Sequence, residues 1–159
     1  MFRKIFQLLN MDLSGRSGTR EVHDSYFGRI IRFWSKKAPR DYWDAELTPE
    51  GTSKPVGITF TGTESGPEEA EVVFCRSILE DPDAAFERCR VAFTPTYEHW
   101  AHTQLPTNWR GAFELDGFEI PLHGDATNDW HICYFAPAAG HHFTAYFKNG
   151  RVQDVVVDG

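Results

Sequence analysis

The last thirty residues of the chain constrain its fold most, because three apolar runs follow one another with turn signals between them. The runs span residues 130–135, 142–147 and 152–157. Asn149-Gly150 separates the last two, and both residue types tolerate the positive φ angles of a type I′ turn. The sequence therefore predicts three consecutive antiparallel strands, whose register decides which side chains share a face.

The register of the first two of these strands predicts one apolar face and one chemically capable face. If the loop at residues 136–141 closes regularly, Phe135, Cys133 and His131 lie opposite His142, Thr144 and Tyr146. Histidine titrates near neutral pH and can activate a neighbouring thiol. The candidate ligand or partner face consists of His131, Cys133, His142, Thr144 and Tyr146. The opposite face, expected in the core, consists of Trp130, Ile132, Tyr134, Phe143, Ala145 and Phe147.

The candidate face is also compatible with an inert, half-exposed sheet surface. No carboxylate motif and no oxyanion-hole motif accompanies it in the sequence, so we assign no catalytic residue. The third strand has two possible registers. A plain Asn149-Gly150 turn places Asp154 beside Ala145 on the core face, whereas a bulged turn places it opposite Thr144. We favour the bulged turn.

The rest of the chain predicts an α+β domain, since strands and helices are grouped rather than alternating. Period-two alternation indicates strands at residues 26–33, 42–47 and 56–61, and helical spacing follows from a start signal at 65–68. Asp81-Pro82-Asp83 begins a second helix, and Thr94-Pro95 predicts a third helical piece over residues 97–102. We expect an antiparallel sheet of about seven to eight strands, with two or three helices inserted mid-chain and packed on one face. The domain is expected to span residues 26–159, after a flexible or helical lead at 1–25.

A second turn signal, Asp116-Gly117, predicts a hairpin between strands at residues 110–115 and 118–122. Its register would set Glu114 directly opposite Glu119. Like charges in directly opposed positions destabilise a strand pair. This candidate acidic pair could receive a cationic partner or a metal, or be neutralised by a nearby lysine or arginine.

The charge distribution bears on the class of partner. The chain has a net charge of −7, but residues 1–40 carry nine Lys/Arg against three Asp/Glu, so residues 41–159 have a net charge of −13. Nucleic-acid binding needs clustered basic residues, so we expect no nucleic-acid partner for this part of the chain. An acidic surface suits a basic protein partner, or serves solubility.

The cysteines and histidines do not form a recognisable metal motif. Cys75, Cys89 and Cys133 are widely spaced, and the sequence contains no CxxC, HExxH or zinc-finger spacing. We therefore expect no metal, no cofactor and no disulfide framework. Reduced thiols indicate a cytoplasmic location. The apolar run near the N-terminus is too short for a membrane span, and the oligomeric state does not follow from the sequence.

Several of these signals together resemble small bacterial domains of unknown function. The residues that carry the resemblance are Phe27-Gly28, Tyr42-Trp43, 56–60, Gly66-Pro67 and Phe74 to Leu79. Such domains have an early Phe-Gly strand, a Trp strand and a Gly-Pro-Glu-capped helix pair. The resemblance covers about residues 26–100 and implies no catalytic residues. Some relatives of this kind are encoded beside toxins and are interpreted as immunity-type proteins.

These observations lead to two functional hypotheses. The first is a non-enzymatic cytoplasmic binding module, of immunity or accessory type, that engages a protein partner through its acidic surface. The alternative is a small-ligand-binding protein or enzyme that uses the His131, Cys133 and Tyr146 face, and it requires a concave pocket there.

Overall fold

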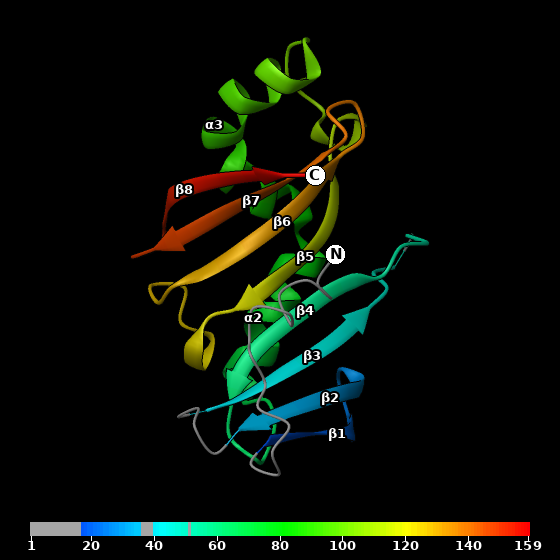
Figure 1. Ribbon diagram of the computed structural model, residues 1–159, viewed down its shortest axis with the longest axis vertical. Coiled ribbons are helices and arrows are strands. Elements are labelled where there is room, and N and C mark those ends of the chain that lie inside the picture. Colours follow the sequence, from blue (N-terminus) through cyan, green and yellow to red (C-terminus); the bar gives the residue numbers. More distant parts are fainter. Residues whose placement is uncertain (1–16, 36–39, 51) are drawn as a thin grey trace.

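The computed structural model describes residues 17–35, 40–50 and 52–159, and it contains one eight-stranded sheet with two α-helices (Figure 1). This is the predicted α+β fold, with strands grouped on either side of two consecutive helices. The strands are β1 (Ser17–Asp24), β2 (Gly28–Ser35), β3 (Asp41–Leu47), β4 (Val56–Gly62), β5 (Glu114–Ile120), β6 (Trp130–Ala136), β7 (His141–Lys148) and β8 (Arg151–Asp158). The helices are α2 (Glu69–Glu80) and α3 (Pro82–Ala101), and two 3₁₀ turns, η2 (Trp109–Gly111) and η3 (Leu122–Gly124), flank β5.

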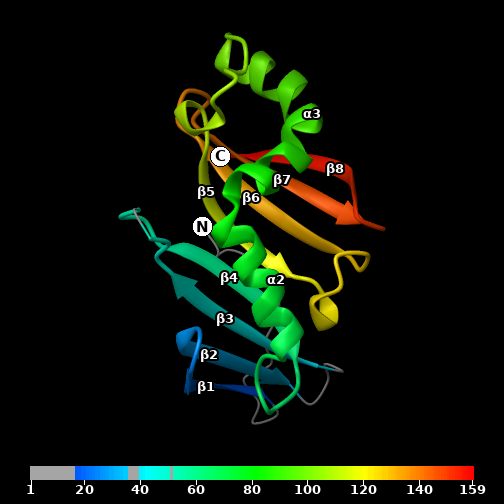
Figure 2. The same ribbon diagram turned by 180° about the vertical axis from the view of Figure 1, so that it is seen from behind.

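The strands lie in the sheet in the order in which they occur in the chain, from β1 to β8. Every neighbouring pair is antiparallel except β4 and β5, which are parallel. Parallel neighbours need a long crossover, and α2 and α3 supply it. Both helices cross behind the strands in Figure 1 and in front of them in Figure 2, so they cover one face of the sheet. We call the opposite face the open face.

The core lies between the helices and the covered face of the sheet. The six residues predicted for the core face of β6 and β7 are all buried, which confirms the predicted register of that hairpin. Phe86 and Phe93 of α3 contact both Phe113 and Tyr134, so the aromatic rings of helix and sheet form one cluster. Aromatic pairs in edge-to-face or offset geometry add to the energy of apolar burial.

Each helix begins with side chains that satisfy its free backbone N–H groups. In α2 the Glu71 carboxylate accepts from the Glu68 N–H at 2.8 Å, and in α3 the Asp81 carboxylate accepts from the Ala84 N–H at 3.0 Å. The prediction of a separate third helical piece at residues 97–102 was wrong, because α3 continues through Pro95 to Ala101. Phe93 and Tyr97 precede and follow Pro95, lie about one helical turn apart, and are both buried. Their packing outweighs the cost of an interior proline.

The boundary of the predicted lead also needs correction. Residues 17–24, which we assigned to the lead, form β1 and pair with β2 along its whole length. The remainder of the lead, residues 1–16, lies outside the described residues. The strand signal at residues 26–33 corresponds to β2, which begins two residues later.

The prediction of a hairpin with its turn at Asp116-Gly117 was wrong. Residues 114–120 form the single strand β5, and a register shift between Leu115 and Gly117 marks an irregularity in its pairing with β6. Glu114 and Glu119 therefore lie on one strand and do not oppose each other. Glu114 pairs with Lys54, while Glu119 pairs with His131. A glycine accommodates a bulge as well as a turn, and pairing with two neighbouring strands favours the extended form here.

The last strand has the expected bulge at a different offset. The β7–β8 register shifts between Tyr146 and Phe147, so Asp154 lies opposite Tyr146 rather than Thr144. Tyr146 and Thr144 share one face of β7, so Asp154 still lies on the open face, as the bulged turn requires. Of the helices that the structure describes, neither is both long and apolar enough to cross a membrane.

Candidate functional site

A row of mostly polar side chains runs straight across the open face from β3 to β8. Strand pairing places Asp44 beside Thr59, Thr59 beside Glu119, His131 beside Tyr146, and Tyr146 beside Asp154. Glu119 joins the two halves of the row through its contact with His131. We call this set the cross-strand row; its members are Asp44, Thr59, Glu119, His131, Tyr146 and Asp154.

The centre of the cross-strand row is a carboxylate–imidazole contact between β5 and β6. Glu119 Oε2 lies 2.9 Å from His131 Nδ1, and the two side chains are 29% and 15% exposed. The imidazole of His131 also lies against the phenol ring of Tyr146, with ring centroids 5.4 Å apart. These contacts hold His131 between a carboxylate and an aromatic ring, so it is positioned rather than free to rotate.

The β3–β4 end of the row is more strongly desolvated than an open sheet face usually is. Thr59 is only 1% exposed, and burial raises the pKa of the neighbouring Tyr42, whose hydroxyl is hydrogen-bonded to Thr59. Burial, with a smaller contribution from the Glu46 carboxylate, raises the pKa of Asp44 to about 6. Ionisation of Asp44 at neutral pH therefore carries a desolvation penalty, and a cation beside the carboxylate would reduce that penalty.

The cysteine of the candidate face is buried and poorly suited to nucleophilic chemistry. Cys133 is 8% exposed, and burial raises the pKa of its thiol to about 12, although a hydrogen bond with Thr144 opposes this. The carboxylates of Asp116 and Asp158 raise it further. Nucleophilic cysteines need the thiolate form, so this environment keeps the thiol protonated and unreactive.

His142 lies at the edge of the same face beside Asp116, with Nε2 3.6 Å from Oδ2. A hollow of about 200 Å³ opens next to it and is also lined by Phe135 and Leu115. This hollow contains neither His131 nor Tyr146, so it is not the concave pocket over His131, Cys133 and Tyr146 that the enzyme alternative requires. Its volume is below the usual range for a ligand site.

A larger cleft lies outside the candidate face, at the corner between α2 and α3. Its volume is about 560 Å³, and Leu79, Trp109 and Phe113 contribute its apolar wall. The rim carries Lys54, whose ammonium pairs with the Glu114 carboxylate, together with Arg110. Glu114, one half of the predicted acidic pair, is thus a rim residue whose charge is neutralised by Lys54, in agreement with the prediction of a nearby lysine or arginine.

The predicted site residues therefore divide into two groups. His131 and Tyr146 belong to the cross-strand row together with Glu119, whereas Cys133, Thr144 and His142 lie on the same face outside it. The sequence analysis did not include Asp44, Thr59 or Asp154 among the candidate site residues. The alternation of Asp44 and Thr59 with buried residues placed them on the non-core face of their strands, but nothing local showed that β4 lies next to β5.

Within the part of the chain that the structure describes, no group of three or more His, Cys, Asp or Glu side chains is arranged to hold a metal ion. Comparison with known proteins gives no further guide to the site: no family model, no curated protein and no solved structure matches this chain.

Proposed function

We propose that this protein is a non-enzymatic binding module that engages a basic protein partner through the open face of its sheet. The observation that carries the proposal is the cross-strand row, which contains three carboxylates, from β3, β5 and β8, and no lysine or arginine. The immunity-type role implied by the family resemblance is one form that such a module takes.

The physical basis is charge complementarity on a partly desolvated surface. Asp44 and Glu119 are held on neighbouring parts of the sheet, and burial already disfavours the charged form of Asp44. A lysine or arginine from a partner would relieve that penalty and gain an ion pair in a setting less screened than open solvent. Electrostatic complementarity of this type also speeds association and selects against acidic partners.

The chemistry of the face supports binding more than catalysis. The thiol of Cys133 is protonated in the native fold, and His131 is engaged by Glu119 and Tyr146. A nucleophile and a base in contact are the minimum for covalent catalysis. Cys133 and His131 are two residues apart on β6, and the two side chains contact different partners: Glu119 for His131 and Thr144 for Cys133.

The test measures binding of the purified full chain to the products of adjacent genes at low and at rising salt. We compare the wild type with a triple variant in which Asp44→Asn, Glu119→Gln and Asp154→Asn neutralise the cross-strand row. The matched control carries Glu69→Gln, Glu80→Gln and Glu98→Gln on the helices, which removes the same charge from the other side of the molecule.

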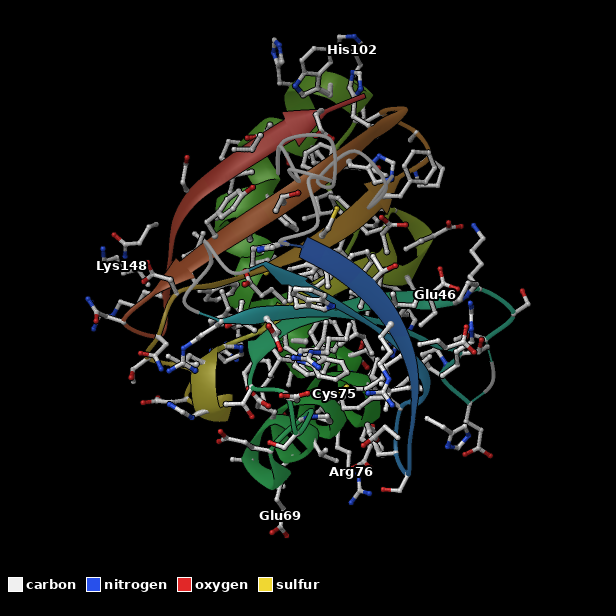
Figure 3. All side chains as sticks on the ribbon, turned by 60° about the horizontal axis from the view of Figure 1, so that its bottom comes forward. Glu46, Glu69, Cys75, Arg76, His102 and Lys148 are labelled. Carbon is white, nitrogen blue, oxygen red and sulfur yellow. The ribbon has the colours of Figure 1, made fainter. Side chains whose placement is uncertain are left out.

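We expect a complex with a basic gene product whose affinity falls as salt rises. The triple variant should bind about tenfold more weakly or worse, because each ion pair lost from the interface is worth about 1 kcal/mol. The control variant should bind as the wild type does. Figure 3 shows the control residue Glu69 projecting from the end of the molecule. The proposal is overturned if no neighbouring product binds at low salt, or if the triple variant and the control behave alike.

A further inference from the structure

Strand β8 forms one edge of the sheet, and within the described chain no other strand pairs with its outer side. It is eight residues long, contains no proline, and keeps its pairing with β7 as far as Asp158. The outer side of an edge strand can pair with another extended chain. In β8 the Val155 N–H donates to the Asp154 carboxylate at 2.9 Å, so an added strand would compete with this local hydrogen bond.

The open face beside this edge combines exposed apolar groups with carboxylates. Tyr146 is 43% exposed and Val156 is 41% exposed, and they are two of the five large hydrophobic side chains exposed in the described residues. Along β8, Asp154 and Asp158 lie on either side of Val156 on this face, and Asp154 is opposite Tyr146. Tyrosine and carboxylates together favour lysine or arginine, because the ring face attracts cations and the carboxylates pair with them.

Charge disfavours a second copy of this chain in the register that centres two β8 edges on Val156. Two-fold antiparallel pairing of two β8 edges centred on Val156 would set Asp154 opposite the copy's Asp158, twice. Like charges in directly opposed positions destabilise a strand pair. A partner strand that carries positive charge has no such penalty.

We propose that the β8 edge is the docking point for the basic partner, which adds an extended segment of its own as a ninth strand. The inference rests on the proposed function and names its mode of binding. Side chains on one face of a strand are two residues apart, so Asp154, Val156 and Asp158 match a segment of the pattern basic–x–apolar–x–basic. The intervening residues of that segment would lie on the side of Val155 and Val157, which pack against the core.

The test uses the full chain and a labelled nine-residue peptide, TVKTVTKVT, whose two lysines are four residues apart. Binding is followed by fluorescence anisotropy at low salt. Two further peptides carry backbone N-methyl groups on all odd or on all even residues. Only every second N–H of an added strand points toward β8, so one methylated peptide should bind about tenfold more weakly and the other nearly as well as the parent. Equal loss in both peptides, or no binding of the parent, overturns strand addition.

Variants of the protein separate this mode of binding from the proposed function itself. Asp154→Asn with Asp158→Asn should weaken the parent peptide by about tenfold, and Glu69→Gln with Glu80→Gln should leave it unchanged. A peptide with glutamate for both lysines should not bind. If a neighbouring gene product binds through the cross-strand row while the peptide shows no N-methyl pattern, strand addition is wrong and the proposed function stands. If the pattern appears but no basic product binds, the proposed function is wrong.

Discussion

Glu119 and His131 face each other across the β5–β6 ladder, with the carboxylate oxygen 2.9 Å from the imidazole nitrogen. Glu119 also lies beside Thr59 of β4, across the parallel β4–β5 pair that joins the strands before the helices to those after them. The polar residues of β3 and β4 thereby become continuous with those of β7 and β8. The surface that we propose for partner binding depends on Glu119, which lies beside Thr59 on one side and contacts His131 on the other.

We expect Glu119→Gln to lower the free energy of unfolding by about 1 kcal/mol, because a half-buried imidazole loses its charged partner. A double-mutant cycle with His131→Gln should give a coupling energy of about 0.5 to 1 kcal/mol in urea unfolding at pH 6. Additive effects of the two substitutions would show that the contact contributes nothing to stability.

The raised pKa of Asp44 predicts a specific pH dependence of the free energy of unfolding. Its pKa is raised to about 6 in the folded state from an ordinary value of 3.8, so the folded protein holds the proton more tightly than the unfolded chain. The stability that this provides is fully present below pH 3.8 and is lost as the pH rises through about 6. Asp44→Asn removes this dependence and should stabilise the protein at pH 7 by about 1 kcal/mol, less than the full shift implies because solvent screens the carboxylate.

The measurement is the difference in unfolding free energy between wild type and Asp44→Asn from pH 4 to pH 7, since other titrating groups cancel in that difference. The difference should grow between pH 4 and pH 6 and stay constant above. Glu46→Gln, an exposed neighbour on the same strand, is the control and should change the profile only slightly. A flat difference would show that Asp44 is not desolvated.

The three cysteines should be unreactive in the native protein. Cys75, Cys89 and Cys133 are buried, and burial raises the pKa of each thiol to about 12. At pH 8 the thiolate fraction of such a group is on the order of 10⁻⁴, so modification by an aromatic disulfide reagent should require unfolding. All three thiols should react in urea. Rapid modification of Cys133 without urea would contradict this prediction and favour the enzyme alternative.

Gly124 should be far less tolerant of substitution than Gly140, although both have φ angles near +68° (+67° and +69°). A Cβ on Gly124 would collide with the carbonyl oxygen of Ala70, whereas nothing in the described part of the chain lies within 4 Å of one on Gly140. Gly140→Ala should cost about 1 kcal/mol for the positive φ alone, and Gly124→Ala about 3 kcal/mol or more because α2 must also move. Urea unfolding of the two variants measures the difference, and equal costs would refute the close approach of η3 to α2.

Local sequence signals predicted the β6–β7–β8 meander, whose strands are neighbours in the chain, but they missed β1 and the offset of the bulge in β8. The alternation of apolar residues and the Asn149-Gly150 turn determined the β6–β7–β8 meander and the side chains on each face, because short connections leave few ways to pair. The same reasoning failed at Asp116-Gly117. An aspartate followed by a glycine suits a turn or a bulge equally, and only the presence of β4 and β6 on either side made the extended form the better choice.

The candidate site divides in the same way. The sequence by itself determined that His131 and Tyr146 share a face of one hairpin, and that Asp44 lies on the non-core side of its strand. Only the tertiary structure decided that they belong to one surface. Thr59 and Glu119 are sixty residues apart in the chain and become neighbours because the crossover through α2 and α3 returns β5 parallel to β4. Burial of the apolar sides of both helices fixes that return, and no local pattern in either strand encodes it.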